Sequence, residues 1–231
     1  MAVTYQNNGV VRDGLVFYVD PSNQRSWPGP NSNIINNLIS SNLSGSLNND
    51  MSGSYGEFNS FILDGVDDYI SLNNISLGGE FTLSWWMKRT DYSGNNHYFF
   101  GEDNADNSDW IRFNSGNLDI RTGNPGNNYQ LSDQGTAPSF TFVNNNVYNI
   151  TITRDSDFLI QAYSNVAVNS SYTPLRLPKA SATPRAFSPN TFGRKNTTYL
   201  NSTIGPIQIY NRALSSSEVK QNYNALKGRF E

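Results

Sequence analysis

Three aspartates in one polar segment have the chemistry of a calcium site. Asp103, Asp106 and Asp109 lie in the sequence GEDNADNSDW, where Asn and Gly indicate a loop. Calcium takes oxygen ligands of this kind from flexible segments. The spacing is not that of an EF-hand loop, and acidic surface turns are common without a metal ion. A bare loop is therefore our preferred interpretation, with calcium as the alternative, and we expect no other cofactor.

A second acidic cluster lies in the sequence LDGVDDY, which contains Asp64, Asp67 and Asp68. The Asp64–Gly65 pair is typical of a tight turn, because Asp hydrogen-bonds to the backbone that follows it and Gly adopts left-handed conformations. We therefore assign this cluster to hairpin geometry rather than to a metal ion.

Candidates for catalysis are few. The chain has one histidine, His97, no cysteine and no G-x-S-x-G motif. A Ser-His-Asp arrangement, a thiolate nucleophile and Cys-ligated zinc are therefore not expected. Glycoside hydrolysis needs two carboxylates placed across the scissile bond, but no strand alternates acidic residues in the required way. We expect no enzyme and no catalytic residue, with a glycoside hydrolase as the least favoured alternative.

Aromatic residues beside polar ones are candidates for sugar binding, because their rings stack on the apolar faces of pyranoses. Trp86, Tyr98, Trp110 and Tyr129 are the residues we select. Aromatic side chains in all-β proteins are nevertheless core residues more often than binding platforms. Trp86 has the alternative of lying beneath a helix or a second layer, and Trp110 that of closing a strand end.

The charge is distributed unevenly along the chain. The formal net charge of −3 argues against a nucleic-acid partner, and no apolar run is long enough to cross a membrane. Between Asp157 and Glu218, however, the chain has no acidic residue. A partner-docking face is our hypothesis for this segment, against the alternative of a solvated loop, and its candidate residues are Arg176, Lys179, Arg185, Arg194 and Lys195.

Period-2 alternation predicts the fold class. In FTLSWWMK, the residues Phe81, Leu83, Trp85 and Met87 share one face, and the segments VYNITIT and LVFYV repeat this pattern with Tyr148, Ile150, Ile152, Leu15, Phe17 and Val19 directed inward. The chain also has 34 Asn and 18 Gly, residue types that are common in turns, and the pattern predicts an all-β protein of two packed antiparallel sheets. We expect an N-terminal arm at 1–13 and one sandwich domain at 14–231.

One helix is predicted, in the sequence ALSSSEVKQNYNALKG near the C-terminus. Ser215 and Glu218 have the spacing of a capping box. Val219, Tyr223 and Leu226 then recur on one narrow face, and Gly228 is expected to end the helix in a left-handed conformation. A narrow apolar stripe favours a plug on the body of the domain over a partner-binding element.

Several segments together resemble the laminin G-like domains of the concanavalin A-like lectin/glucanase superfamily, in the versions found in virion proteins of tailed bacteriophages. They are GLVFYVDPSN, NLSGSLNN, FILDGVDDYISL, FTLSWWMKR, TFGR and IQIYNRALSSSEVKQNYNALKGRF. The resemblance implies a concanavalin A-like jelly roll with one short C-terminal helix, whose rim loops bind glycans or proteins, sometimes with calcium. Gly205–Pro206 departs from relatives that carry an Asp near this position, which weakens the case for calcium and indicates an edge or bulge.

The resemblance implies a non-catalytic structural protein of a phage virion, such as a capsid decoration, neck or tail-accessory protein. Its lectin-like domain would face outward and contact host surface glycans. Its partners would be other virion proteins, and the resemblance is compatible with an oligomer of this chain. Such a protein is assembled in the host cytoplasm and is located on the virion. The N-terminal arm and the segment from Arg176 to Lys195 are the expected docking elements. The alternative is a cellular carbohydrate-binding module.

Overall fold

The computed structural model describes residues 9–41, 44–49, 52–54, 59–73, 75–90, 97–102, 110–114, 117–121, 129–130, 143–157, 160–166, 173–176 and 186–230. Their strands form two large antiparallel sheets and one small ribbon. Sheet A has the order β14 (Thr173–Arg176), β13 (Ile160–Val166), β12 (Val147–Arg154), β7 (Phe81–Arg89), β18 (Asn201–Tyr210), β5 (Ser60–Asp64) and β4 (Ser52–Ser54), and β1 (Leu15–Val19) also pairs with β18.

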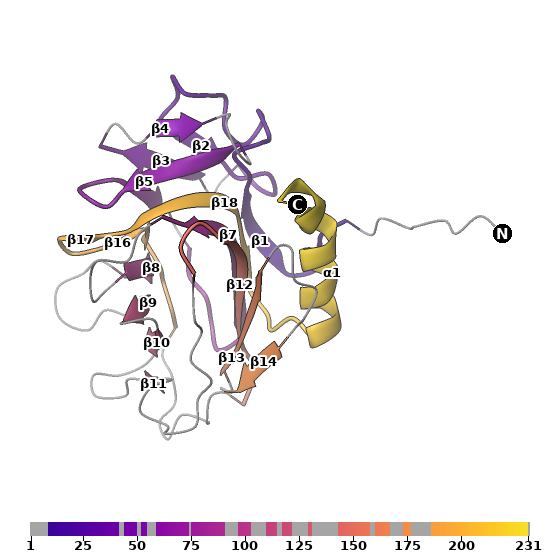
Figure 1. Ribbon diagram of the computed structural model, residues 1–231. Coiled ribbons are helices and arrows are strands. Elements are labelled where there is room, and N and C mark those ends of the chain that lie inside the picture. Colours follow the sequence, from indigo (N-terminus) through magenta and orange to yellow (C-terminus); the bar gives the residue numbers. More distant parts are fainter. Residues whose placement is uncertain are drawn as a thin grey trace.

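Sheet B packs against sheet A. Its order is β11 (Tyr129–Gln130), β10 (Asn117–Arg121), β9 (Trp110–Asn114), β8 (His97–Gly101), β15 (Thr191–Phe192), β6 (Tyr69–Leu72), β3 (Ser44–Asn48) and β2 (Ile34–Asn36). The small ribbon pairs β16 (Arg194–Lys195) with β17 (Thr198–Tyr199). The helix α1 (Ser216–Leu226) lies on the side of sheet A that faces away from β8, β9 and β10 (Figure 1), and the short 3-10 helix η2 (Lys227–Arg229) follows it.

The core between the sheets confirms the alternation read from the sequence. Phe81, Leu83, Trp85 and Met87 of β7 are each at most 1% exposed and belong to one apolar cluster with side chains of sheet B. The Trp85 ring lies 4.9 Å from that of Phe99 on β8. This arrangement confirms the predicted two-sheet antiparallel sandwich with one short C-terminal helix.

A bulge in β1 corrects one inward assignment. Phe17 and Val19 lie in the core between the sheets, but Leu15 belongs to a separate cluster on the outer face of sheet A, with Tyr18 and Tyr210. The register with β18 shifts between Leu15 and Phe17. Because a bulge adds one residue to a strand, side chains on its two sides exchange faces.

The interruption expected at Gly205–Pro206 is a bulge within β18. Before it, Ile204 pairs with Phe61 of β5, and after it, Ile207 pairs with Val19 of β1. The register with β7 shifts at the same place. Proline donates no backbone hydrogen bond, so it stands where β18 exchanges one neighbour for another. A Cβ atom on Gly205 would lie 3.0 Å from the Cβ of Trp86, which explains the glycine beside it.

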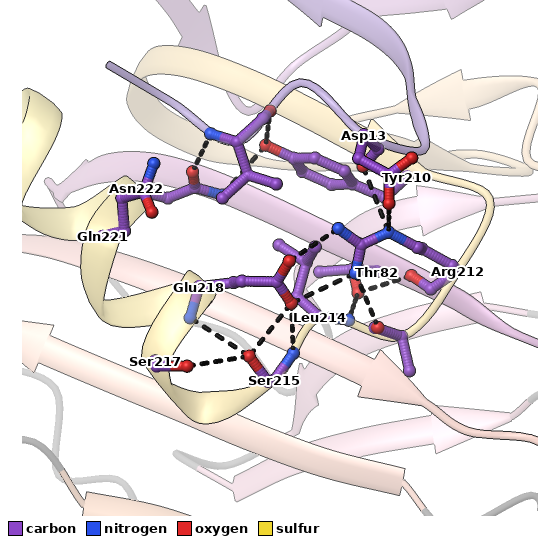
Figure 2. A network of polar contacts seen from close by, with 12 residues as sticks. Asp13, Thr82, Tyr210, Arg212, Leu214, Ser215, Ser217, Glu218, Gln221 and Asn222 are labelled. Carbon is purple, nitrogen blue, oxygen red and sulfur yellow. Dashed lines mark hydrogen bonds and ion pairs between the residues drawn. The ribbon is translucent and has the colours of Figure 1, made fainter. Parts of the chain in front are cut away.

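The start of α1 is held by a network of polar contacts that Figure 2 shows. Ser215 and Glu218 form the predicted capping box. The carboxylate of Glu218 accepts two hydrogen bonds from Arg212, at 2.7 and 3.1 Å, and one from the amide of Ser215 at 2.8 Å. The Nε of Arg212 also lies 2.8 Å from the carboxylate of Asp13. The network therefore joins the helix to the end of β18 and to the N-terminal segment.

The buried stripe of α1 confirms its interpretation as a plug on its own domain. Val219, Tyr223 and Leu226 are buried as predicted, and Asn222 is buried with them. The ending is different from the prediction, because Gly228 is not among the residues with positive φ. Instead the chain tightens into η2, and the Lys227 amide donates to the Tyr223 carbonyl. No helix in the described part of the chain is long and apolar enough to cross a membrane.

The described part of the predicted N-terminal arm lies against α1. The Val11 amide donates to Oδ1 of Asn222 at 2.8 Å, and the Tyr210 hydroxyl donates to the Val11 carbonyl at 3.1 Å. The side-chain amide of Asn222 donates in turn to the Tyr210 hydroxyl at 2.9 Å. These bonds lie in a buried site, so residues 9–13 belong to the packed fold, while residues 1–8 lie outside the described part of the chain.

We predict that Phe230→Ala lowers the free energy of unfolding by about 3 kcal/mol, because loss of a buried ring leaves a cavity. Phe230 is 5% exposed and stacks on Trp86 with ring centroids 4.2 Å apart. Urea denaturation would measure the change, with Val66→Ala as a control at a site that is 70% exposed. A loss below about 1 kcal/mol would show that the stack does not hold the C-terminal segment.

We also predict a pH dependence that comes from the capping box. The hydrogen bonds from Arg212, followed by those from Ser215, lower the pKa of Glu218 from 4.5 to about 2, against the opposing effect of burial. The charged carboxylate therefore stabilises the fold above pH 4.5, and this contribution is lost as the pH falls toward 2.

The comparison is between the wild-type chain and Glu218→Gln, by urea denaturation at several pH values. The wild type should be more stable by about 1 kcal/mol at pH 6, because the partly exposed pair is screened by water, and the difference should shrink toward pH 2. Glu80→Gln is the control for a glutamate outside this network. A difference that does not vary with pH would contradict the assignment.

Candidate functional site

Trp86 is not a sugar-binding platform, which corrects the first of the aromatic candidates. Its side chain is 1% exposed. The ring is stacked between Tyr223 of α1, at 5.5 Å, and Phe230, at 4.2 Å. Trp86 does lie on the outward face of β7, but α1 and the residues after it cover that face. Its alternative interpretation, a tryptophan beneath the helix, is the correct one.

Tyr98 and Trp110 lie together on neighbouring strands of sheet B. Arg112, which the sequence did not single out, joins them: its guanidinium lies 4.2 Å from the centre of the Trp110 ring and donates to the Tyr98 hydroxyl at 3.0 Å. Tyr98 is 9% and Trp110 5% exposed. Neither ring is an open platform, and their role in sugar binding stays a prediction. Tyr129 pairs with Ile120 at the end of this sheet.

The predicted calcium residues Asp103, Asp106 and Asp109 lie outside the described residues. The other acidic cluster is described, and carboxylate oxygens of Asp64, Asp67 and Asp68 lie within 4.8 Å of one another. Oδ1 of Asp64 accepts from the amides of Val66 and Asp67, and Asp68 accepts from the amide of Asp64. The carboxylates therefore shape their own turn, as expected for Asp64–Gly65, where Gly65 has φ of +81°.

This turn is not a hairpin, which corrects the assignment made from the sequence. β5 before the turn belongs to sheet A, and β6 after it belongs to sheet B. The turn is thus an arch that carries the chain from one layer of the sandwich to the other. Turn chemistry alone does not distinguish an arch from a hairpin, because the local backbone is similar in the two.

The basic residues proposed for partner docking do not lie together on one described surface. Lys179 and Arg185 lie outside the described residues, and Arg176 lies on the edge strand β14. Arg194 and Lys195 form β16 within the fold. Lys195 is only 9% exposed, so it belongs to the packed structure and not to an open docking surface, which corrects its assignment.

A polar groove that the sequence did not reveal lies between two asparagine-rich segments. It has a volume of about 810 Å³, and its described lining residues, none of which is charged, are Pro30, Asn31, Ser32, Asn33, Leu47, Asn48 and Asn49. The Leu47 amide donates to the Asn33 carbonyl at 2.7 Å, which brings the segments together. The NSN and LNN runs were the only signal, and in a chain with so many asparagines they were not distinctive.

One wall of the groove is held rigidly. The side-chain amide of Asn48 donates to the Ser71 hydroxyl at 2.8 Å and to the Ser46 carbonyl at 3.0 Å. Asn49, in a left-handed conformation with φ of 60°, donates to the Asp67 carbonyl at 2.7 Å. These bonds tie the groove to β6 and to the arch between the sheets.

A half-buried aromatic cluster adjoins this wall. Tyr69 is the register partner of Asn48 on β6. The Arg194 guanidinium lies 4.1 Å from the centre of the Tyr69 ring, and the Tyr199 ring lies 6.4 Å from it. The site therefore combines amides that both donate and accept hydrogen bonds, hydroxyl groups, and an aromatic surface beside a cation. Such a set of groups suits a ligand rich in hydroxyl groups.

We predict that the Asp64 side chain acts by its oxygen acceptor and not by its charge. Asp64→Asn keeps an acceptor for the amides of Val66 and Asp67 and should change the free energy of unfolding by less than about 0.5 kcal/mol. Asp64→Ala should cost about 1 kcal/mol. Both would be measured by urea denaturation with calcium and with EDTA. A calcium-dependent stabilisation of the wild type that both variants lose would instead indicate a metal site.

Comparison with known proteins places the chain in a family. A family model described as the concanavalin A-like lectin/glucanases superfamily matches residues 64–220. No curated protein matches the sequence at a significant level. Among solved structures, the binding domain of botulinum neurotoxin DC in complex with SialylT has a TM-score of 0.65 at 14% identity, over 93% of this chain and 52% of that chain.

Two further structures have the same fold. The botulinum neurotoxin serotype D binding domain has a TM-score of 0.63 at 18% identity, over 91% of this chain and 51% of that chain. A Trypanosoma rangeli sialidase has a TM-score of 0.63 at 14% identity, over 95% of this chain and 34% of that chain. The chain thus spans about half of the toxin domains and a third of the sialidase. Because the family model covers well over half of the sequence, the chain belongs to the concanavalin A-like lectin/glucanases superfamily.

Proposed function

We propose that this chain is a non-catalytic glycan-binding domain whose ligand lies in the asparagine-lined groove, beside the cluster of Tyr69, Arg194 and Tyr199. The observation that carries the proposal is the composition of this site. Side-chain amides line the cavity, none of its described lining residues is charged, and an aromatic ring with a stacked guanidinium adjoins it. Amides match the mixed donors and acceptors of sugar hydroxyls, and aromatic rings match their apolar faces.

The exposure of the lining residues supports this choice. Asn31 and Asn33 are exposed, and neither side chain has a hydrogen-bond partner in the described part of the chain. Asn48, by contrast, donates to three acceptors in the sheet. The groove therefore has a fixed wall and a wall with free hydrogen-bonding groups, which is the arrangement of a preformed binding site.

The positions of the described carboxylates support the proposal that the domain is non-catalytic. Asp64 and Asp68 accept hydrogen bonds from backbone amides of their own turn. Glu102, at the end of β8, is 8% exposed. A glycosidase needs two carboxylates that face each other across a cleft, and none of the described residues that line the proposed groove carries a carboxylate. The likeness to a sialidase at 14% identity concerns the fold alone.

One of the related structures indicates where a ligand search should begin. The botulinum neurotoxin DC domain was determined in complex with SialylT. For this chain, Arg194 beside the groove is the group that would suit a carboxylated sugar, through a charge-assisted hydrogen bond. Sialylated and neutral glycans therefore both belong in the test.

We also propose that the domain is displayed on a bacteriophage virion as a capsid decoration, neck or tail-accessory protein. The support is the resemblance of its sequence segments, above all the closing YNRALSSSEV, to laminin G-like domains of phage structural proteins. Mass spectrometry of purified particles tests this directly. Absence of the chain from the particles would contradict the location and favour a cellular carbohydrate-binding module.

The glycan proposal predicts that the double variant Asn31→Ala/Asn33→Ala, and separately Tyr69→Ala, weaken binding about tenfold or more, as loss of central contacts does. Glycan arrays with calcium and with EDTA would identify the ligand, and titration calorimetry would measure the affinities. Asn224→Ala is the matched control, since Asn224 is exposed on α1. Equal binding by all variants, or no bound glycan on the arrays, would refute the proposed site.

A further inference from the structure

A second pocket lies on the helix side of the molecule and shares no lining residue with the groove. Its volume is about 370 Å³. The N-terminal part of the chain and the end of α1 form its walls. The described lining residues are Gly9, Val10, Arg12, Tyr18, Asn23, Arg25, Leu38, Ala225 and Leu226. The site is therefore created by the packing of the N-terminal segment against the helix.

Two exposed arginines line this pocket. Arg12 and Arg25 are exposed, and neither guanidinium forms a hydrogen bond or ion pair with a described residue. The other arginines of this region are paired: Arg212 binds Glu218, and Arg229 binds Asp20 with two hydrogen bonds of 2.8 and 2.9 Å. None of the described lining residues carries a carboxylate.

The rest of the lining is apolar or neutral. Leu38 and Leu226 contribute aliphatic surface, and Tyr18 and Asn23 contribute polar groups. Tyr18 donates its hydroxyl proton to Asp20 at 3.3 Å, so the tyrosine is part of the fixed structure. A ligand that fits must therefore combine an apolar group with a negative charge.

We propose that this pocket binds an acidic peptide segment of a partner protein, with an apolar side chain against Leu38 and Leu226 and a neighbouring carboxylate on Arg12 and Arg25. Charge complementarity supports this occupant, because Arg12 and Arg25 form no ion pair with a described carboxylate, whereas Arg212 and Arg229 do. Guanidinium groups bind carboxylates through two parallel hydrogen bonds, which adds orientation to charge. The proposal is independent of glycan binding, since the groove uses other residues.

The test uses N-acetylated, C-amidated peptides of nine residues with Leu-Asp or Phe-Glu at the centre. Their matched controls have Leu-Asn or Phe-Gln, which keep the shape and remove the charge. Two-dimensional amide NMR of the full chain would locate binding, and fluorescence anisotropy of labelled peptides would measure affinity. The acidic peptides should shift the amide signals of Arg12, Asn23, Arg25 and Leu38 and should bind about tenfold more tightly than the neutral ones.

The double variant Arg12→Gln/Arg25→Gln should weaken this binding about tenfold and reduce its dependence on salt. Its glycan binding should be unchanged, and Lys220→Gln, an exposed cation on α1, is the matched control. Equal affinity for acidic and neutral peptides, no binding by any peptide, or no effect of the double variant would overturn the proposal. Signals that shift with N-acetylneuraminate but with no peptide would also overturn it, in favour of a sugar-acid site.

Discussion

The central strands of sheet A are buried on both faces, and the C-terminal part of the molecule is built to satisfy that constraint. One face of β7 packs into the core between the sheets. The other bears Thr82, Ser84 and Trp86, which are also at most 2% exposed. Buried hydroxyl groups need partners: Thr82 bonds to the chain just before α1, and Ser84 shares a hydrogen bond with Thr151 of β12. The helix is thus a cover with matching polar and aromatic groups.

The sequence pattern predicted the strands well because a side-chain period of two is a local property. It predicted the environment of each strand face less well, because alternation does not show whether the outward face is exposed to solvent or covered by another element. For this reason the sequence left two interpretations of Trp86 open, a sugar-binding residue and a tryptophan beneath a helix, and the second is correct. Leu15 was misplaced because a bulge has no sequence signal in LVFYV. The ending at Gly228 was wrong because the chain continues into η2, after which Phe230 stacks on Trp86.

The candidate groove could not be predicted, since it is made by the approach of residues 30–33 to residues 47–49. Asparagines in both segments looked like ordinary turn residues. The family model begins at residue 64 and does not include them. A site of this kind arises in the N-terminal part of the fold, outside the residues that the family model matches, and only the pairing of β2 with β3 brings its parts together.

The partners of β18 have a consequence for how the chain folds. β1, near the start, pairs with the end of β18, so that Leu15 is opposite Tyr210, and Val11 bonds to Asn222 across 211 positions. Contacts this distant in sequence form slowly, because a long loop must close before they stabilise anything. During synthesis, β1 cannot pair with β18 until residues 201–210 have left the ribosome. The folding of this domain is therefore completed late, because β1 must wait for β18.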